Sequence, residues 1–199
     1  AKVTFTFNAS SLKGKTIVVF EELYQEDLKL AVHADITDQD QTIYFPEIGT
    51  TAKDKETDMN LSQADKEVTL VDTVAYKNLL PGEEYVMTGT LMDKETGKPV
   101  EIDKKEVTAE TTFTPKESSG TVDVIFSFDG TSLAGKTVVV FESATYDGKE
   151  FATHADLEDN GQTIYFPEIA TTAKDKATEI ILPKPIKRLP SLTRLNIVT

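Results

Sequence analysis

AVHADITDQDQTIYFPEIGTTAKDK (residues 31–55) is followed later in the chain by ATHADLEDNGQTIYFPEIATTAKDK (residues 152–176). A second pair of matching segments lies upstream of these, namely LKGKTIVVFEELY (12–24) and LAGKTVVVFESATY (133–146). Both pairs have the same offset of 121 positions (152 minus 31), so the chain contains an internal repeat. A period of this length fits one β-sandwich domain and is far too long for one unit of a solenoid.

Short β-strand patterns fill the repeat. They are rich in Val, Thr, Phe and Tyr, alternate with a period of two, and are separated by Pro-Gly, Ser-Gly and Asp-Gly turn signals. No stretch sustains the apolar period of an amphipathic helix. The sequence therefore predicts an all-β chain of tandem immunoglobulin-like antiparallel β-sandwiches. The predicted strands include VTFTF, TIVVF, QTIYF, VTLVDTVAY, YVMTGTLMD, EVTAETTFTP, TVDVIFSF and TVVVFES.

The first copy of the repeat is incomplete, because the segment 66–115 has no counterpart upstream of it. The missing part is either supplied by another chain or absent through truncation. We therefore predict four regions. They are the C-terminal part of a first domain (1–55), a linker (56–65), a complete sandwich (66–176) and an irregular tail of unknown role (177–199).

The composition is acidic and free of cysteine. Among 199 residues, 34 acidic side chains outnumber 21 basic ones, and the net charge of −13 disfavours nucleic acid and anionic membranes as partners. The absence of Cys excludes disulfides, thiolate metal sites and Cys nucleophiles. No apolar run is long enough to span a membrane, and the alternating start AKVTFTFNAS does not resemble a signal peptide. We therefore expect the export signal and the anchor to lie outside this fragment.

The two histidines of the chain occupy the same position in the two copies. Each begins a His-Ala-Asp motif, and a Gln follows eight positions later (162 minus 154), before Thr-Ile-Tyr-Phe. Three roles are open for His154: a structural histidine, a metal ligand with Asp156 and Asp159, or a general base that activates a hydroxyl. The acidic DLEDNG turn could also hold calcium, although it lacks the spacing of an EF-hand loop.

Carboxylates at the ends of apolar strands are the other candidates for chemistry. Glu142 closes VVVFE and Glu21 closes IVVFE, so we expect each of them near the core. A buried carboxyl group has a raised pKa and tends to be protonated or to share a proton with a second acid. Asp93 follows the apolar strand YVMTGTLM and is either such an acid or a strand-end residue in contact with water.

VTLVDTVAYKNLLPGEEYVMTGTLMDKETGKPV, followed by VVVFE and by HADLEDNGQTIYFPEIATTAKD, resembles the ester-bond domains (VaFE or T-Q domains) of Gram-positive surface adhesins. The resemblance covers the predicted complete domain, 66–176, and the partial copy, 1–55. In that family a Thr on the first strand and a Gln on the last strand join spontaneously as an intramolecular ester. A His and a buried pair of acids assist the reaction.

Carried over to this sequence, the resemblance implies that Thr73 supplies the ester-forming hydroxyl and Gln162 the ester-forming amide. His154 would be the base that takes the hydroxyl proton. The reaction would occur once per domain, release ammonia and need no cofactor or metal ion. It would therefore be maturation of the protein and not enzyme turnover.

The acid pair of the resemblance includes Glu142. Its partner is expected to be Asp93, with Asp103 as the alternative. A shared proton between two carboxyl groups would stabilise the oxyanion that develops during acyl transfer.

The partial copy contains Gln41, His33 and Glu21 but no counterpart of Thr73, so we do not expect it to form an ester by itself.

The resemblance further implies a structural stalk repeat, outside the cell and anchored to the cell wall. Its partners would be neighbouring repeats, a chain that completes the first domain, and an unidentified host ligand. A covalent tie between first and last strands would make a pulling force act on a bond and not on a hydrogen-bond ladder.

Three other functions remain open on the residues. A Lys–Asn isopeptide sandwich could use Lys136, although no Asn ends the TIYFPEI strand in either copy. A ligand-binding module could use the loops of a sandwich, but no aromatic platform is visible. A hydrolase based on His154 would need a nucleophile motif that the sequence lacks.

Overall fold

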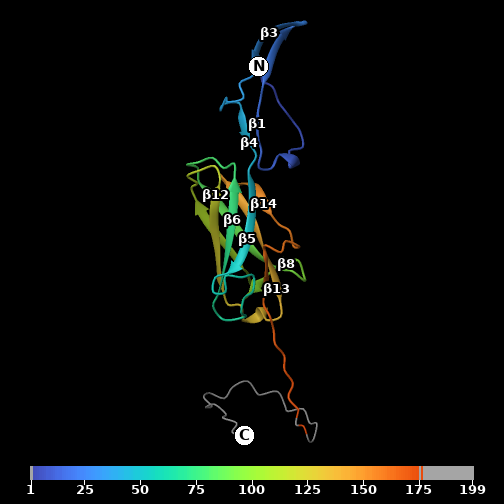
Figure 1. The fold of residues 1–199 in the computed structure, drawn as a ribbon, viewed down its shortest axis with the longest axis vertical. Helices are drawn as coiled ribbons and strands as arrows, with labels where there is room; N and C mark the ends of the chain where they lie inside the picture. Colours follow the sequence, from blue (N-terminus) through green and yellow to red (C-terminus); the bar gives the residue numbers. More distant parts are fainter. Residues whose placement is uncertain (1, 175, 177–199) are drawn as a thin grey trace. The chain divides into compact units, whose positions relative to one another are not determined.

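The computed structural model describes residues 2–174 and 176 of the chain (Figure 1). Every regular element in this part is a β-strand or a short 3-10 helix, and all strand ladders are antiparallel. The prediction of an all-β antiparallel fold is therefore confirmed. No helix in the described residues is long and apolar enough to cross a membrane.

The first copy forms two small sheets. Strand β1 pairs with β4, and β2 pairs with β3. The elements are η1 (Ser10–Leu12), β1 (Thr16–Val18), β2 (Glu21–Gln25), β3 (Leu28–His33) and β4 (Thr42–Tyr44).

The rest of the described chain forms a sandwich of two larger sheets. The smaller sheet has the order β12-β6-β5, and its strands lie side by side in Figure 1. It consists of β5 (Glu47–Asp54), β6 (Val68–Lys77) and β12 (Gly120–Phe128). The larger sheet has the order β11-β7-β13-β14, with β15 paired to β13 and β8 paired to β7. It consists of β7 (Tyr85–Asp93), β8 (Lys98–Pro99), β11 (Thr108–Phe113), β13 (Thr137–Tyr146), β14 (Lys149–His154) and β15 (Thr163–Tyr165). The hairpin β9 (Glu101–Ile102) and β10 (Lys105–Glu106) and the turn η2 (Thr131–Leu133) complete the domain.

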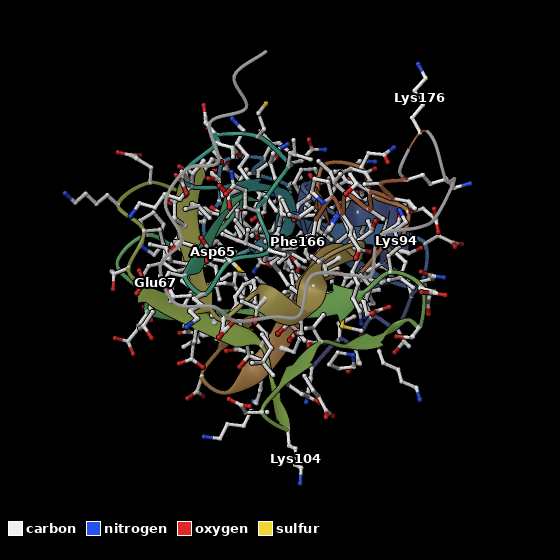
Figure 2. All side chains as sticks on the ribbon, turned by 90° about the horizontal axis from the view of Figure 1, so that it is seen from below. Asp65, Glu67, Lys94, Lys104, Phe166 and Lys176 are labelled. Carbon is white, nitrogen blue, oxygen red and sulfur yellow. The ribbon has the colours of Figure 1, made fainter. Side chains whose placement is uncertain are left out.

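The core lies between these two sheets. Leu70 and Phe126 from the smaller sheet and Met87 and Leu91 from the larger sheet are buried in one hydrophobic cluster. In Figure 2, Phe166 lies among the strands whereas Lys104 points away from them, in keeping with Phe166 belonging to that cluster. The alternation of inward and outward side chains along each strand produces this division.

The sandwich begins earlier than the sequence predicts. The repeat predicts that residues 47–54 belong to the first copy, but Glu47–Asp54 pairs over its whole length with residues 70–77 of β6 and is an edge strand of the sandwich. The predicted linker 56–65 also belongs to the sandwich. Within it, buried Ser62 donates a hydrogen bond to Asp54 Oδ2 at 2.6 Å.

The repeat alone places PEIGTTAKDK (46–55) and PEIATTAKDK (167–176) at the end of each copy, because each follows its matching QTIYF segment directly. In the structure the first of these segments supplies a strand to the sheets that follow it. The predicted tail, 177–199, lies outside the described residues.

Candidate functional site

Four polar side chains meet inside the sandwich. Thr50 lies on β5, Asp72 on β6 and Glu142 on β13, while Gln162 directly precedes β15. Asp72 and Gln162 are fully buried, at 0 % exposure, and Glu142 is 2 % exposed. The group is therefore polar at a depth where the surrounding residues are apolar.

Strand alternation brings Asp72 to this position. Along β6, Leu70, Asp72 and Val74 are buried, whereas the intervening side chains face outward or are partly exposed. Thr50 reaches the same interior because β5 alternates in the same way, with Ile48 and Ala52 buried on either side of it. Both strands thus place a polar residue between two buried apolar neighbours on the inner face.

The loop before β15 holds Gln162 against β5 and β13. The Gln162 carbonyl accepts a hydrogen bond from the Val140 N–H at 3.1 Å, which fixes it to β13. The preceding carbonyl, of Gly161, accepts one from the Ala52 N–H at 2.9 Å, which fixes the loop to β5. The amide of Gln162 is therefore held beside the strand that carries Thr50.

The two carboxyl groups of the cluster change each other's protonation. Burial and, after it, the nearby Asp72 carboxyl raise the pKa of Glu142 to about 10, while Thr50 opposes the change. Burial also raises the pKa of Asp72, although its contacts with Glu142 and Gln162 lower it. The contact between the acids raises one pKa and lowers the other, so the shared proton resides on Glu142.

The polar atoms of this cluster lack regular hydrogen bonds. Thr50 Oγ1, both carboxyl oxygens of Asp72 and of Glu142, and both amide atoms of Gln162 are buried without a hydrogen-bond partner of good geometry. A buried unpaired polar atom costs on the order of 1–3 kcal/mol. Several such atoms in one place call for an explanation, and a catalytic role of the groups is one.

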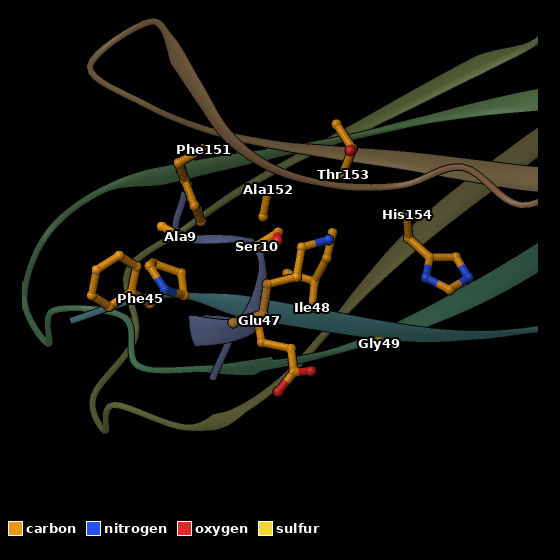
Figure 3. A pocket seen from close by; sticks show the side chains of 12 residues that line it. Ala9, Ser10, Phe45, Glu47, Ile48, Gly49, Phe151, Ala152, Thr153 and His154 are labelled. Carbon is orange, nitrogen blue, oxygen red and sulfur yellow. The ribbon is translucent and has the colours of Figure 1, made fainter. Parts of the chain in front are cut away.

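His154 borders the cluster from the end of β14. It lies opposite Glu142 in the β13–β14 ladder, and its charge acts on Asp72. Its Nε2 lies 2.7 Å from Asp159 Oδ2, and the side chain is 25 % exposed. Figure 3 shows His154 beside a cavity of about 530 Å³ that Gly49 also lines, so His154 has access to solvent.

Thr73, predicted as the ester-forming hydroxyl, does not join this cluster. It follows Asp72 on β6 and therefore points to the opposite face of the strand, where it is exposed. Its Oγ1 donates a hydrogen bond to Asp123 Oδ1 at 2.8 Å on the neighbouring strand. This hydroxyl is on the outer surface and not beside Gln162.

Asp93 and Asp103, predicted as alternatives for the second acid, also lie elsewhere. Asp93 pairs with Lys136 at 3.1 Å, and although burial raises its pKa, the Thr96 N–H and Lys136 lower it overall. Asp103 lies in the exposed turn between β9 and β10 with a φ of 52°. The acid that contacts Glu142 is Asp72, and Lys136 uses its ammonium group in the ion pair with Asp93.

Of the candidate residues, the structure therefore places Glu142, Gln162 and His154 near one another, together with Thr50 and Asp72. The sequence held a signal for Asp72, because VTLVDTVAY alternates so that its apolar positions share a face with this residue. Among residues 2–174 and 176, no group of three or more His, Cys, Asp or Glu side chains is arranged to hold a metal ion.

Comparison with known protein families gives a match over most of the chain. The family model described as "T-Q ester bond containing domain" matches residues 1–45 and again residues 46–166. No curated protein matches the sequence.

The fold also resembles solved structures of a bacterial adhesin from Mobiluncus mulieris containing intramolecular disulfide, isopeptide and ester bond cross-links. The P1 crystal form has a TM-score of 0.50 at 16% sequence identity, over 62% of this chain and 57% of that chain. The P21 form has a TM-score of 0.46 at 17% identity, over 60% and 56% of the two chains. The chain thus spans little more than half the length of these proteins.

Proposed function

This chain belongs to the family of T-Q ester bond containing domains, and from that premise we propose that residues 46–166 crosslink themselves through an ester between Thr50 and Gln162. The observation that carries the proposal is the burial of Thr50 Oγ1 and the Gln162 amide, both without hydrogen-bond partners, beside two carboxyl groups. Thr50 replaces Thr73 in this assignment, and Asp72 replaces Asp93.

The chemistry follows from the residue types. His154 takes the proton of the Thr50 hydroxyl, and Oγ1 attacks the side-chain carbonyl carbon of Gln162. A C–O bond forms, the C–N bond breaks, and the proton passes to the departing nitrogen, which leaves as ammonia. The protonated Glu142 donates a hydrogen bond to the developing oxyanion, and the negative charge of the nearby Asp72 keeps the proton on Glu142.

A primary amide is a weak electrophile, so the protein must supply most of the acceleration by position. Holding Thr50 on β5 and Gln162 before β15 makes the attack intramolecular. The buried surroundings of Gln162 keep water away from the ester after it has formed. The reaction happens once in each domain and has no external substrate, so the domain is not an enzyme in the usual sense.

The crosslink has a mechanical consequence because of where it lies. It joins the first and last strands of the sandwich and closes a loop of roughly 110 residues, which on the analogy of a disulfide stabilises the fold by about 5 kcal/mol. A force applied to the two ends of the domain then acts on covalent bonds. Unzipping of the strands would require breaking the ester.

We further propose that the whole chain is part of the stalk of a surface adhesin, which consists of repeated domains of this kind. The family match over residues 1–45 is the back part of a preceding domain. The segment PEIATTAKDK (167–176) has the sequence of the first strand of a following domain. The partners are neighbouring repeats of the same protein. The acidic surface, with a net charge of −13, favours a soluble, self-repelling array outside the cell.

The test is the intact mass of the purified chain. We expect a deficit of one ammonia in the wild type, no deficit in Thr50→Ala, and the wild-type deficit in the matched control Thr73→Ala. Fragmentation should recover the Thr50 and Gln162 peptides joined to each other. An unmodified wild-type mass would refute the crosslink, and a deficit that disappears in Thr73→Ala would return the assignment to Thr73.

A further inference from the structure

Asp159 contacts both the ring of His154 and the loop that carries Gln162. Its Oδ2 lies 2.7 Å from His154 Nε2, and its Oδ1 accepts a hydrogen bond from the Gly161 N–H at 2.7 Å. Its backbone carbonyl accepts hydrogen bonds from Thr163 Oγ1 at 2.7 Å and from the Gln162 N–H at 3.3 Å. One residue thus fixes the position of the proposed base and of the proposed electrophile.

The charge of Asp159 determines what the histidine ring can do. Although burial raises the pKa of Asp159, the Gly161 N–H and the His154 ring lower it overall, so the side chain is a carboxylate. A carboxylate has only acceptor sites, so the imidazole nitrogen that faces it must carry a hydrogen. In neutral His154 that nitrogen is Nε2, and Nδ1 is left as the ring atom able to accept a proton.

We propose that Asp159 is a positioning residue that holds His154 as the Nε2–H tautomer and so makes Nδ1 the atom that takes the Thr50 proton. This inference rests on the proposed ester. Asp159 touches neither reacting atom in the proposed step. It acts through the ring of His154.

The same contact occurs in the first copy, where His33 Nε2 lies 2.6 Å from Asp38 Oδ2. His33 and Asp38 have the same spacing as His154 and Asp159. In the described residues, the first copy has no counterpart of the strands that carry Thr50 and Asp72. The His–Asp contact is therefore a local product of the His-Ala-Asp turn, formed without the buried cluster.

Asparagine at position 159 would invert the tautomer. Its single oxygen can keep the hydrogen bond from Gly161, which turns the amide NH2 toward His154 Nε2. That nitrogen must then accept, which moves the ring proton to Nδ1 and removes the base. We expect Asp159→Asn to slow ester formation by at least about 100-fold, the range of general-base catalysis.

The rate is measured on chain recovered unreacted in denaturant, refolded by dilution, quenched at intervals and weighed intact. The matched control is Asp38→Asn, which makes the same change in the first copy and should leave the ammonia loss at the wild-type rate. A wild-type rate in Asp159→Asn would overturn the inference. No ammonia loss in the wild type would instead overturn the proposed function.

A second measurement leaves Asp159 intact. Nitrogen-15 NMR of the two histidine rings in Thr50→Ala, at alkaline pH where histidine is neutral, reports which nitrogen is protonated. His33→Gln identifies the signals. We expect hydrogen on Nε2 of His154, and hydrogen on Nδ1 would overturn the inference whether or not the Asp159→Asn chain folds.

Discussion

The segments 1–45 and 122–166 contain the same motifs and share two strand pairings, β1–β4 with β13–β15 and β2–β3 with β13–β14. Glu21 lies opposite His33 in the β2–β3 ladder as Glu142 lies opposite His154 in the β13–β14 ladder. Each ladder has a register shift at the corresponding place, between Leu23 and Tyr24 in the first. The surroundings differ, since the His33 side chain is 51 % exposed and that of His154 only 25 %.

The apolar residues show the same difference more strongly. Phe5 is 60 % exposed, whereas its counterpart Phe126 is 1 % exposed in the core. Ile43 is exposed and its counterpart Ile164 is fully buried. The strands β5, β6 and β7 cover the second segment, and in the described residues nothing equivalent covers the first. The Glu-His-Gln motif therefore forms locally in both copies, but only in the second copy is it buried, as the proposed reaction requires.

The largest expected effect comes from removing the two glutamines in turn. Gln162→Ala should abolish the ammonia loss and lower the free energy of unfolding by about 5 kcal/mol, because the crosslink cannot form. Gln41→Ala should leave both quantities at the wild-type value. Intact mass and urea unfolding measure them. Loss of the ester in Gln41→Ala would mean that the first copy, too, takes part in a site.

Substitutions of the two corresponding glutamates, Glu142 and Glu21, should differ in the same way as those of the two glutamines, with a smaller effect. Glu142→Gln keeps the shape of the side chain but alters the hydrogen bond at the oxyanion, so we expect ester formation to slow by about 100- to 1,000-fold. Glu21→Gln should not change the rate. The refolding and mass assay described above measures it. Equal rates in Glu142→Gln and wild type would show that Glu142 is not part of the machinery.

Stability without the crosslink should depend on pH. In Thr50→Ala, Glu142 keeps its proton up to about pH 10 when folded, whereas in the unfolded chain its pKa is near 4.5. The unfolded state then binds fewer protons between these values. The stabilising contribution is therefore complete below the unfolded pKa and is lost as the pH rises toward 10.

We expect the free energy of unfolding of Thr50→Ala to fall by about 1 kcal/mol per pH unit between about pH 6 and about pH 9. Urea unfolding across this range measures it. The control is the double variant Thr50→Ala with Glu142→Gln, in which the slope should become smaller. A flat profile in Thr50→Ala would contradict the buried protonated acid.

The smallest effect tests burial alone. Phe151 packs against Tyr85, with ring centroids 5.6 Å apart, and Phe151→Ser should cost about 2 kcal/mol of stability. Its counterpart Leu30 is 51 % exposed, so Leu30→Ser should change stability by less than about 0.5 kcal/mol. Thermal unfolding of the two variants gives the comparison. A comparable loss in Leu30→Ser would mean that the first copy is packed in solution.

The repeat, the all-β architecture and the grouping of Glu142, His154 and Gln162 in one part of the chain can all be predicted from the sequence. Glu142, His154 and Gln162 lie within one short part of the chain, and period-two alternation with turn signals is a local property. For this reason the strand pairing of the first copy matches that of the second, although the apolar side chains of the first copy are exposed.

The positions of Thr50 and Asp72 relative to these three residues depend on how the strands assemble. Strand β5 is distant in sequence from β13 and β15, so its Thr50 could not be assigned to the site before the pairing of β5 with β6 was known. The choice between Asp72 and Thr73 depended on one residue of register, because neighbouring residues on a strand face opposite sides. Alternation pointed to Asp72, but only the opposing sheet shows which face is interior. Burial between the two sheets then raised the pKa of Glu142, and burial is a property of the assembled sandwich.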